Sequence, residues 1–266
     1  MTREPTPLAL YDRPAWYDAL HAEGTASWAD FLLRLGRRHG TGGPRWLEPA
    51  CGTGRFLRVL GRRGLRVTGY DSHPGALAYA RRRLPRGTEA LEADMTSFVR
   101  PGAYDLAFCL LGSFRHLLDE RSARRHLELT RRSLKPGGVY VVGLDLVDWR
   151  WPEPGEDDWK ARRGGLTLDD LVVSLPPERR PRRERIVHFL SVRTPKTSGL
   201  YKSEYDLRAY DIRQWLGTAR AAGFTVAAAY SAWRKPIPLD ENARDATFVL
   251  QAARQSGTSR TRRQAP

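Results

Sequence analysis

The chain has 266 residues, 41% of them hydrophobic, which is enough to bury the core of one α/β domain of ordinary size. Its two cysteines, Cys51 and Cys109, have neither metal-ligand spacing nor the density of a disulfide framework, so we expect a reducing compartment, the cytoplasm. The longest apolar run, residues 139–147, contains Asp145 and is too short to span a bilayer, and we expect no signal peptide because the first residues have no apolar core. We expect neither a membrane partner nor a metal ion.

The net charge of +15 is concentrated in two stretches, since residues 160–202 and 254–266 together carry 11 of these charges. Basic stretches attract phosphate backbones, which keeps nucleic acid as an alternative partner. Nearly all the basic residues are arginine, however, and abundant arginine with alanine and glycine also reflects genome base composition. We expect the polar end, residues 255–266, to be a disordered basic tail.

The first predicted helix precedes the first strand. Its apolar side chains recur at the i, i+3, i+4 and i+7 spacing of a helix face, and they are Trp28, Phe31, Leu32 and Leu35. The stretch from Gly40 to Pro44 ends this helix. Upstream lies a separate aromatic segment that contains Tyr11 and Tyr17.

A strand, a tight turn and a helix are predicted over residues 46–60. Two apolar residues begin this stretch, Gly52 and Gly54 form a turn of small residues, and the following apolar side chains recur at helical spacing. Glycine lets the backbone approach a bound molecule closely, and a helix start offers unpaired N–H groups. A second strand, residues 66–71, ends in Asp71, where nucleotide-binding βαβ units place an acid that binds ribose hydroxyls.

Residues 47–54 resemble motif I of the class I S-adenosylmethionine-dependent methyltransferases, an acid followed by three alternating small residues. Ala50 replaces the first glycine of that motif. Three later features match in order and spacing. Asp71 matches the ribose-binding acid, Asp94 matches the acid that contacts the adenine amino group, and residues 134–138 match the turn before strand five.

This resemblance covers roughly residues 45–147. It implies S-adenosylmethionine as cofactor and an α/β fold with a doubly wound, seven-stranded, Rossmann-like sheet. The residues that it implies for cofactor binding follow motif I and the ends of strands two to four: Glu48, Ala50, Cys51, Gly52, Gly54, Arg55, Asp71, Ser72, Asp94, Met95 and Leu110. His73, which follows them, could stack on or border the adenosine, but we favour an exposed loop histidine.

The loop after strand four should face the transferring methyl group, because ligands of doubly wound sheets lie where the strand order reverses. His116 in this loop is the best general-base candidate, since histidine has a pKa near neutrality. The alternative is that His116 is a structural histidine, which caps a helix or packs in the core. In that case Ser113 or Arg115 could orient the substrate instead. The loop resembles that of some amino-sugar N-methyltransferases, and it lacks the Asn/Asp-Pro-Pro-aromatic string of enzymes that methylate base amines. Cys109 in the strand is interpreted as packing.

Two additions to the sheet are expected. Residues 1–43 form an N-terminal lid in relatives with small-molecule substrates, which makes Tyr11 and Tyr17 catalytic candidates, with aromatic packing on the sheet edge as the alternative. Residues 149–210 resemble a small antiparallel β cap, for which alternating apolar residues predict three strands after residue 165. Acids and tryptophans after strand five suit a cationic or ring-shaped substrate, or they close the core.

Together these features predict one methyltransferase domain over residues 44–254 that transfers a methyl group to an N or O atom of a small molecule. Two alternatives remain. One is an RNA or protein methyltransferase that holds a polyanion with the arginine-rich loop 179–185, and the other is a non-catalytic relative that only binds the cofactor.

Overall fold

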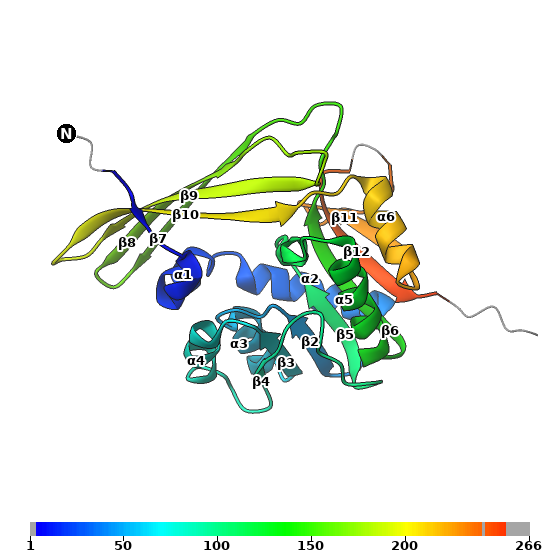
Figure 1. The fold of residues 1–266 in the computed structure, drawn as a ribbon. Coiled ribbons are helices and arrows are strands. Elements are labelled where there is room, and N and C mark those ends of the chain that lie inside the picture. Colours follow the sequence, from blue (N-terminus) through cyan, green and yellow to red (C-terminus); the bar gives the residue numbers. More distant parts are fainter. Residues whose placement is uncertain (1–3, 241–242, 254–266) are drawn as a thin grey trace, which may run out of the picture.

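A seven-stranded sheet forms the centre of the molecule (Figure 1), in a computed structural model that describes residues 4–240 and 243–253. The strand order is β11-β12-β6-β5-β2-β3-β4. All pairs are parallel except those made by β12, which runs against both β6 and β11. The strands are β2 (Arg45–Pro49), β3 (Arg66–Asp71), β4 (Glu89–Glu92), β5 (Tyr104–Cys109), β6 (Leu134–Asp145), β11 (Phe224–Ser231) and β12 (Asp245–Ala252). The predicted tail, residues 255–266, lies outside the described residues.

Helices cover both faces of this sheet. One face carries α2 (Thr25–His39), α3 (Arg55–Arg62) and α4 (Pro74–Arg81), and the other carries α5 (Glu120–Ser133) and α6 (Ile212–Ala221). Alternate residues of one strand therefore enter different cores: Leu106 and Phe108 pack on the α2–α4 side, and Ala107 and Cys109 on the α5–α6 side. This arrangement confirms the predicted doubly wound sheet. Burial raises the pKa of the Cys109 thiol to about 12.

A second sheet lies above the carboxyl ends of the parallel strands of the first sheet (Figure 1). Its strand order is β1-β10-β9-β8-β7. Its strands are β1 (Thr6–Pro7), β7 (Gly155–Arg163), β8 (Leu166–Ser174), β9 (Arg183–Arg193) and β10 (Ser198–Arg208). All pairs are antiparallel except the short β1–β10 pair. The sequence predicted three strands here and missed β7. That strand has charged, exposed side chains typical of a sheet edge, so no apolar alternation marks it.

The N-terminal segment joins the two sheets. Leu10, which starts the short helix η1 (Leu10–Asp12), and Leu20, which ends α1 (Pro14–Leu20), pack with apolar residues of β8 and β9. Asp18 of α1 is buried and accepts hydrogen bonds from Arg58 at 2.5 Å, Arg163 at 2.9 Å and Tyr79 at 3.0 Å. These partners belong to α3, β7 and α4, so one carboxylate holds α1 between the central sheet and the second sheet.

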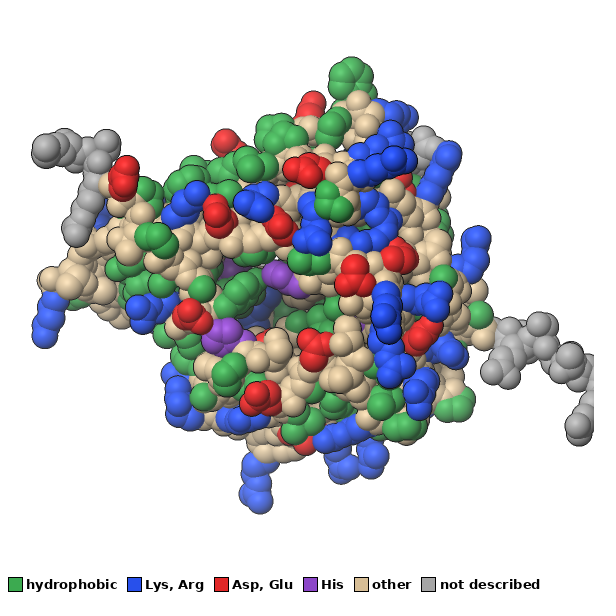
Figure 2. Space-filling model, in the orientation of Figure 1, with side chains coloured by type: hydrophobic (Ala, Val, Ile, Leu, Met, Phe, Trp, Pro, Cys, Tyr) green, Lys and Arg blue, Asp and Glu red, His purple; other side chains and the backbone are tan. Residues whose placement is uncertain are grey.

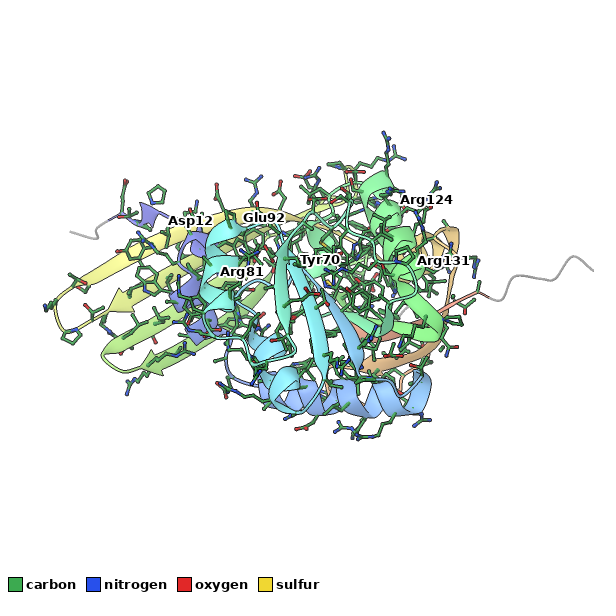
Figure 3. The ribbon with its side chains drawn as sticks, turned by 90° about the horizontal axis from the view of Figure 1, so that it is seen from below. Asp12, Tyr70, Arg81, Glu92, Arg124 and Arg131 are labelled. Atoms are coloured by element: carbon green, nitrogen blue, oxygen red, sulfur yellow. The ribbon has the colours of Figure 1, made fainter. Side chains whose placement is uncertain are left out.

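Two surface features frame the site. Figure 2 shows a hollow between the two sheets, with histidine side chains at its rim and acidic side chains around it. The basic side chains gather elsewhere on this face, over the helical side of the central sheet. Seen from below, Arg124 and Arg131 lie along α5 on the outside of the molecule (Figure 3).

Candidate active site

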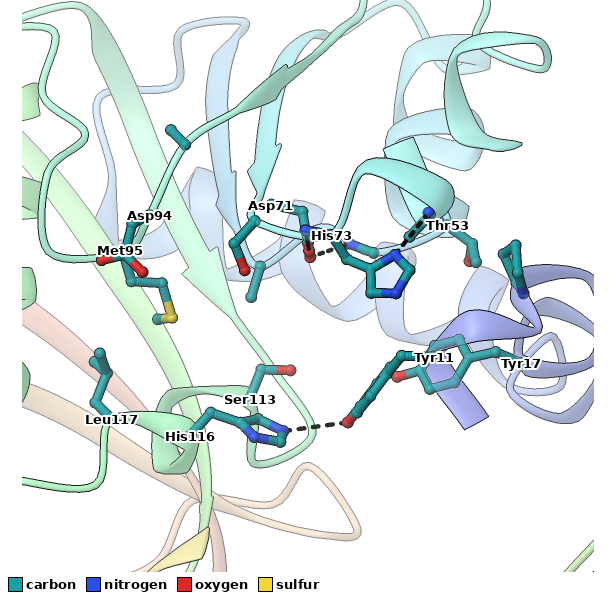
Figure 4. Close-up of a pocket in the computed structure, with 16 residues that line it drawn as sticks. Tyr11, Tyr17, Thr53, Asp71, His73, Asp94, Met95, Ser113, His116 and Leu117 are labelled. Atoms are coloured by element: carbon teal, nitrogen blue, oxygen red, sulfur yellow. Dashed lines mark hydrogen bonds between the residues drawn. The ribbon is translucent and has the colours of Figure 1, made fainter. Parts of the chain in front are cut away.

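The site begins where the strand order reverses, between β2 and β5. From β2 the chain continues through α3 to β3 on one side, and from β5 it continues to β6 on the other. The loops that follow β2 and β5 therefore diverge and leave a crevice at the carboxyl ends of the strands. A cavity of about 330 Å³ occupies this crevice (Figure 4), and its wall includes nine predicted site residues: Tyr11, Tyr17, Ala50, Gly52, Asp71, Ser72, Asp94, Met95 and His116.

The turn after β2 brings backbone close to this cavity. Gly52 has a left-handed conformation (φ 51°), and a Cβ added there would meet no protein atom within 4 Å. Its open side allows a ligand to contact the main chain. Ala50, which replaces the first glycine of the motif, also has a left-handed conformation (φ 52°), which glycine would adopt at lower cost.

Asp71 joins this turn to the start of α4. Its Oδ2 accepts a hydrogen bond from the Gly52 N–H at 2.8 Å, and its Oδ1 accepts one from the His73 N–H at 2.9 Å. Each carboxylate oxygen has a second lone pair available, so Asp71 can still accept two hydroxyl hydrogen bonds from a ribose. His73 itself caps α4, because its Nδ1 accepts from the Ala76 N–H at 3.1 Å.

A second acidic position lies on the other side of the cavity (Figure 4). Asp94 accepts hydrogen bonds from both the N–H and the hydroxyl of Thr96, at 2.7 and 2.5 Å, and these bonds lower the pKa of its carboxyl group. The buried His126 lies 3.0 Å from the Met95 carbonyl and holds this segment in place. The segment therefore presents an ionised acid and an apolar thioether side by side, which suits the amino edge and the face of an adenine ring.

Three predicted cofactor residues serve packing and do not line this cavity. Gly54 begins α3 with φ 68°, and a Cβ there would lie 3.1 Å from Ala80. Cys51 is buried against Gly69 of β3, where any side chain would collide with its sulfur. Leu110 is buried in the apolar core on the α2–α4 side.

Two more predicted residues also lie outside the cavity wall. Glu48 is buried, burial raises its pKa well above the ordinary value, and its Oε2 has no hydrogen-bond partner in the described chain. An unpaired buried carboxyl group next to the motif I turn fits a ligand that brings a cationic group, because the cation would stabilise its ionised form. Arg55 points the other way, donating to the His21 carbonyl at 2.6 Å and to Thr25 Oγ1 at 3.2 Å.

The three predicted catalytic residues come together although they are far apart in sequence. The His116 Nε2 lies 3.2 Å from the Tyr11 hydroxyl (Figure 4), and the Tyr11 and Tyr17 rings are 5.3 Å apart. Burial and the positive charge of Arg115 lower the pKa of His116, so its imidazole is neutral at neutral pH. Burial raises the pKa of Tyr11 well above its ordinary value, so its phenol stays protonated. The pair therefore offers a neutral base beside a neutral hydroxyl group.

A larger cavity of about 700 Å³ adjoins the first, and Tyr11, Tyr17, Ser113 and His116 line both. It lies between the second sheet and the ends of β6 and β12. Its wall has six carboxylates, which are Asp145, Asp148, Glu153, Asp157, Glu184 and Asp245. The guanidinium groups in the same wall are those of Arg55, Arg115 and Arg244. The larger cavity is thus an acidic chamber that opens onto the proposed base.

Most residues of the acidic chamber were not predicted as site residues. Trp159, His188 and Tyr205 line it from three strands of the second sheet. The available signal was strand alternation, because inward-facing residues of one strand are two apart. Alternation shows which side chains of a strand share one face, but it does not show that this face lines a cavity.

The acidic chamber should make folding stability depend on pH. Burial, together with the charges of Asp145 and Asp157, raises the pKa of Asp245 to about 6. A carboxyl whose pKa is higher in the folded state loses stability as pH rises from about 4 through about 6. Asp245→Asn should therefore raise the melting temperature at pH 8 and change it little at pH 4. Asp158→Asn, which removes an exposed carboxylate of β7, is the control and should not stabilise the protein at pH 8.

Comparison with known proteins agrees with this geometry. Residues 47–138 match the family model for a methyltransferase domain. The chain is 28% identical over 199 residues to dTDP-3-amino-3,6-dideoxy-α-D-glucopyranose N,N-dimethyltransferase of Streptomyces fradiae, covering 73% of this chain and 75% of that protein. It is 33% identical over 132 residues to glycine/sarcosine N-methyltransferase of Parasynechococcus marenigrum, covering 48% and 44% of the two chains.

Solved structures share the fold over nearly the whole chain. Streptomyces venezuelae DesVI superposes with a TM-score of 0.73 at 20% identity, covering 90% of this chain and 96% of its own. CalS10, an amino pentose methyltransferase from Micromonospora echinaspora, gives 0.68 at 24% identity, with 93% and 98% covered. Residues 47–138 form a methyltransferase domain, and the chain as a whole has the fold of these solved methyltransferases. These matches support S-adenosylmethionine as the cofactor.

Two features are absent from residues 4–240 and 243–253. No helix in those ranges is long and apolar enough to cross a membrane. No group of three or more His, Cys, Asp or Glu side chains there is arranged to hold a metal ion.

Asp71→Ala should weaken S-adenosylmethionine binding to this methyltransferase by roughly 2–4 kcal/mol, because two ribose hydroxyls would lose a charged acceptor. Calorimetry of the binding measures this loss. Glu92→Ala is the control, since Glu92 is exposed at the end of the neighbouring strand (Figure 3) and pairs in register with Asp71. An affinity of Asp71→Ala within about threefold of wild type would contradict the ribose assignment.

Proposed function

We propose that this methyltransferase transfers the methyl group to an amine nitrogen of a small molecule bound in the acidic chamber. The observation that supports this proposal is the shared wall of the two cavities. Tyr11, Tyr17 and His116 stand between a cavity with the features of a cofactor site and a larger chamber with an excess of carboxylates. A donor and an acceptor bound on either side would meet at these three residues.

The residues of the smaller cavity fit S-adenosylmethionine. Asp71 would hold the ribose, Asp94 and Met95 would border the adenine, and the open backbone at Gly52 would contact the chain of the methionine. The unpaired oxygen of Glu48 would attract the methionine ammonium group from beneath the turn. When bound, the cofactor supplies a methyl group already activated by its sulfonium charge.

The charges of the chamber support a cationic acceptor. Its six carboxylates outnumber its three arginines. The arginines are also engaged within the chain, because Arg115 pairs with Asp145 and Glu184, and Arg244 donates to Asp148 at 2.7 Å. A pyrophosphate would therefore meet net negative charge. A free amine, protonated at neutral pH, would be attracted.

Nitrogen as the acceptor atom is also supported by relatives. The matched proteins from Streptomyces fradiae and Parasynechococcus marenigrum are both named N-methyltransferases, one for an amino sugar and one for glycine and sarcosine. The first is named for a nucleotide-linked sugar. We propose an acceptor that differs from it in lacking the nucleotide diphosphate, because of the acidic wall.

The chain's own residues would perform two tasks. The first is alignment, since holding the acceptor nitrogen in line with the activated carbon supplies most of the rate in such transfers. The second is proton removal, because an ammonium nitrogen has no lone pair to attack with. His116 is neutral, borders both cavities and is placed to take that proton. Tyr11 holds the imidazole through its hydrogen bond.

The arginine-rich loop 179–185 does not strengthen the nucleic-acid alternative. Arg182 pairs with Glu120 at 2.6 Å and Arg185 with Asp206 at 2.7 Å, so two of its charges are neutralised within the chain. Such surface pairs contribute little energy, but they reduce the net field that a phosphate backbone would meet.

Incubation of the full chain with S-adenosylmethionine and four acceptor panels tests the proposal. The panels are free amino sugars and other small amines, nucleoside-diphosphate amino sugars, hydroxyl-only sugars, and short RNA. Mass spectrometry is expected to show added methyl groups in the free-amine panel. Methylation of the nucleotide-linked or hydroxyl panel alone would contradict the proposed acceptor, methylation of RNA would favour the polyanion alternative, and cofactor binding without any turnover would favour a non-catalytic relative.

A further inference from the structure

A third cavity, of about 420 Å³, lies at the amino ends of the parallel strands, at the opposite end of the central sheet from the candidate active site. Its wall contains the first residue of four neighbouring strands, which are Arg45 of β2, Arg66 of β3, Glu89 of β4 and Tyr104 of β5. Its volume falls within the range of roughly 300–1,000 Å³ that is usual for small-molecule sites. None of the described residues in this wall lines either of the other two cavities.

The charge of this wall is positive. Three arginines, Arg45, Arg66 and Arg100, face one acid, Glu89, among the described residues of the wall, which leaves an excess of two positive charges. Glu89 is already engaged, because it pairs with Arg100 and accepts a hydrogen bond from the Thr68 hydroxyl at 2.8 Å. The other two arginines therefore have no acid of the wall to neutralise them.

These two arginines lie side by side. Arg45 and Arg66 are opposite each other in the register of β2 and β3, so their side chains leave the same face of the sheet. Both residues are exposed, and neither guanidinium group has an ion pair or hydrogen bond within residues 4–240 and 243–253. Like charges directly opposite each other on neighbouring strands are destabilising, and an anion bound between them would remove the repulsion.

A buried hydroxyl group in the same wall lacks an acceptor. Tyr104 is 3% exposed, and its hydroxyl group has no hydrogen-bond partner in the part of the chain that the structure describes. Arg100 lies close to this hydroxyl group, but a guanidinium group can only donate, so it cannot accept the O–H proton. Buried polar groups are nearly always hydrogen-bonded. An unpaired O–H beside a surplus of guanidinium groups indicates a ligand that brings acceptor oxygens.

We propose that this cavity binds a small phosphate-bearing anion, either free phosphate or a phosphate monoester. Arg45 and Arg66 hold its oxygens, because the guanidinium fork matches phosphate geometry, and one oxygen accepts the Tyr104 O–H. The Arg100 side chain is 44% exposed, so it can move to let that oxygen approach. A phosphate monoester has a charge of about −2 and three acceptor oxygens, which match the excess charge and the donors of the wall better than a carboxylate does. This inference is independent of the proposed function.

Calorimetric titration of the full chain with inorganic phosphate at pH 8, in a buffer without other multivalent anions, tests the proposal. One saturable site is expected, and Arg66→Gln should weaken it by at least about tenfold, because a charged donor is lost. Arg37→Gln is the control, since it removes the same charge from the last turn of α2, outside all three cavities. The absence of a saturable site at millimolar phosphate, or an equal loss in both variants, would overturn the proposal.

Tyr104→Phe tests the buried hydroxyl group. Without phosphate the melting temperature should not fall, because the hydroxyl group makes no hydrogen bond within the described chain. With saturating phosphate the wild type should gain melting temperature and Tyr104→Phe should gain less, because a ligand stabilises the folded state according to its affinity. Tyr140→Phe is the control and should melt lower without phosphate, since the Tyr140 hydroxyl lies 2.8 Å from the His126 Nε2. A lower melting temperature of phosphate-free Tyr104→Phe, or an equal gain on adding phosphate, would contradict the assignment.

Three further titrations identify the ligand and its place. Saturating S-adenosylmethionine should leave the phosphate affinity unchanged, and competition would place the phosphate in the cofactor cavity and overturn the proposal. Tighter binding of glucose 6-phosphate than of inorganic phosphate would assign the site to a phosphate monoester, and equal affinities would assign it to free phosphate. Short RNA that binds through Arg66, with no binding of either small anion, would replace the proposed ligand with a polyanion.

Discussion

Replacing His116 with glutamine is expected to lower turnover of the amine acceptor by roughly 10²–10⁴-fold, the usual contribution of a positioned general base. Glutamine keeps a hydrogen-bonding side chain beside Tyr11 but has no nitrogen that binds a proton. The affinity for S-adenosylmethionine should change little, because Asp71 and Asp94 remain. Single-turnover kinetics with the amine identified by the panel measures the loss, and calorimetry measures cofactor binding.

The pH dependence of the same reaction gives a second check. A base acts in its unprotonated form, so the rate should rise with pH through the pKa of His116 and then level off. Burial and Arg115 lower that pKa, which places the rising limb below pH 6.5, lower than an exposed histidine would give. His116→Gln should lose this limb.

A matched variant controls for a general histidine effect. His39→Gln removes an imidazole whose Nε2 is hydrogen-bonded to the Tyr230 hydroxyl at 2.9 Å. His39 lines neither cavity, so this variant should keep normal turnover. Near-normal turnover of His116→Gln would show that alignment alone suffices. Loss of cofactor binding would instead assign His116 to the structural framework.

Replacing Arg115 with alanine is expected to destabilise the protein by about 3–5 kcal/mol, the usual cost of removing one partner of a buried ion pair, here the pair of Arg115 with the mostly buried Glu184. The Arg115 side chain is 2% exposed. It pairs with Asp145 of β6 at 3.0 Å, pairs with Glu184 of β9, and donates to the Arg208 carbonyl of β10 at 3.0 Å. One guanidinium group thus joins the loop after β5 to both sheets.

Differential scanning calorimetry tests this expectation, and a loss of this size corresponds to a fall in melting temperature of about 10 °C. Arg124→Ala is the control, because Arg124 is exposed on α5 and makes only a surface pair with Glu128 four residues away. Its removal should change stability by less than about 0.5 kcal/mol. An equal, small effect in both variants would mean that water replaces the contacts of Arg115.

Several residues of the smaller cavity could be predicted because their evidence is local in the sequence. The turn at residues 50–54 and Asp71 belong to one βαβ unit, whose strands are adjacent and parallel. Glycine placement, helical spacing and the acid at a strand end all reflect short-range constraints. The structure places Gly52, Asp71 and Asp94 around one cavity. Gly54, Cys51 and Leu110 were also predicted but lie outside this cavity wall. The motif alone does not distinguish a residue that contacts the ligand from one that packs in the core.

Arg115 shows a second reason why the role of a residue could not be predicted from the sequence. The sequence suggested it as a residue that could orient the substrate, beside Ser113. Its partners Asp145 and Glu184 are 30 and 69 residues away, so no local pattern indicates the pairs that engage it. In the structure it is a buried link between the two sheets.

The sequence by itself determined the doubly wound sheet, its switch point and the acids that line the smaller cavity, because strand and helix periodicities and turn chemistry act over a few residues. Only the tertiary structure decided the acceptor side. Tyr11 meets His116 across 105 residues, and Asp170 meets His188 across a strand pair. The second sheet brings six carboxylates around one chamber. Long-range packing sets such contacts, since the charge and direction of a site depend on which faces the folded chain turns toward each other.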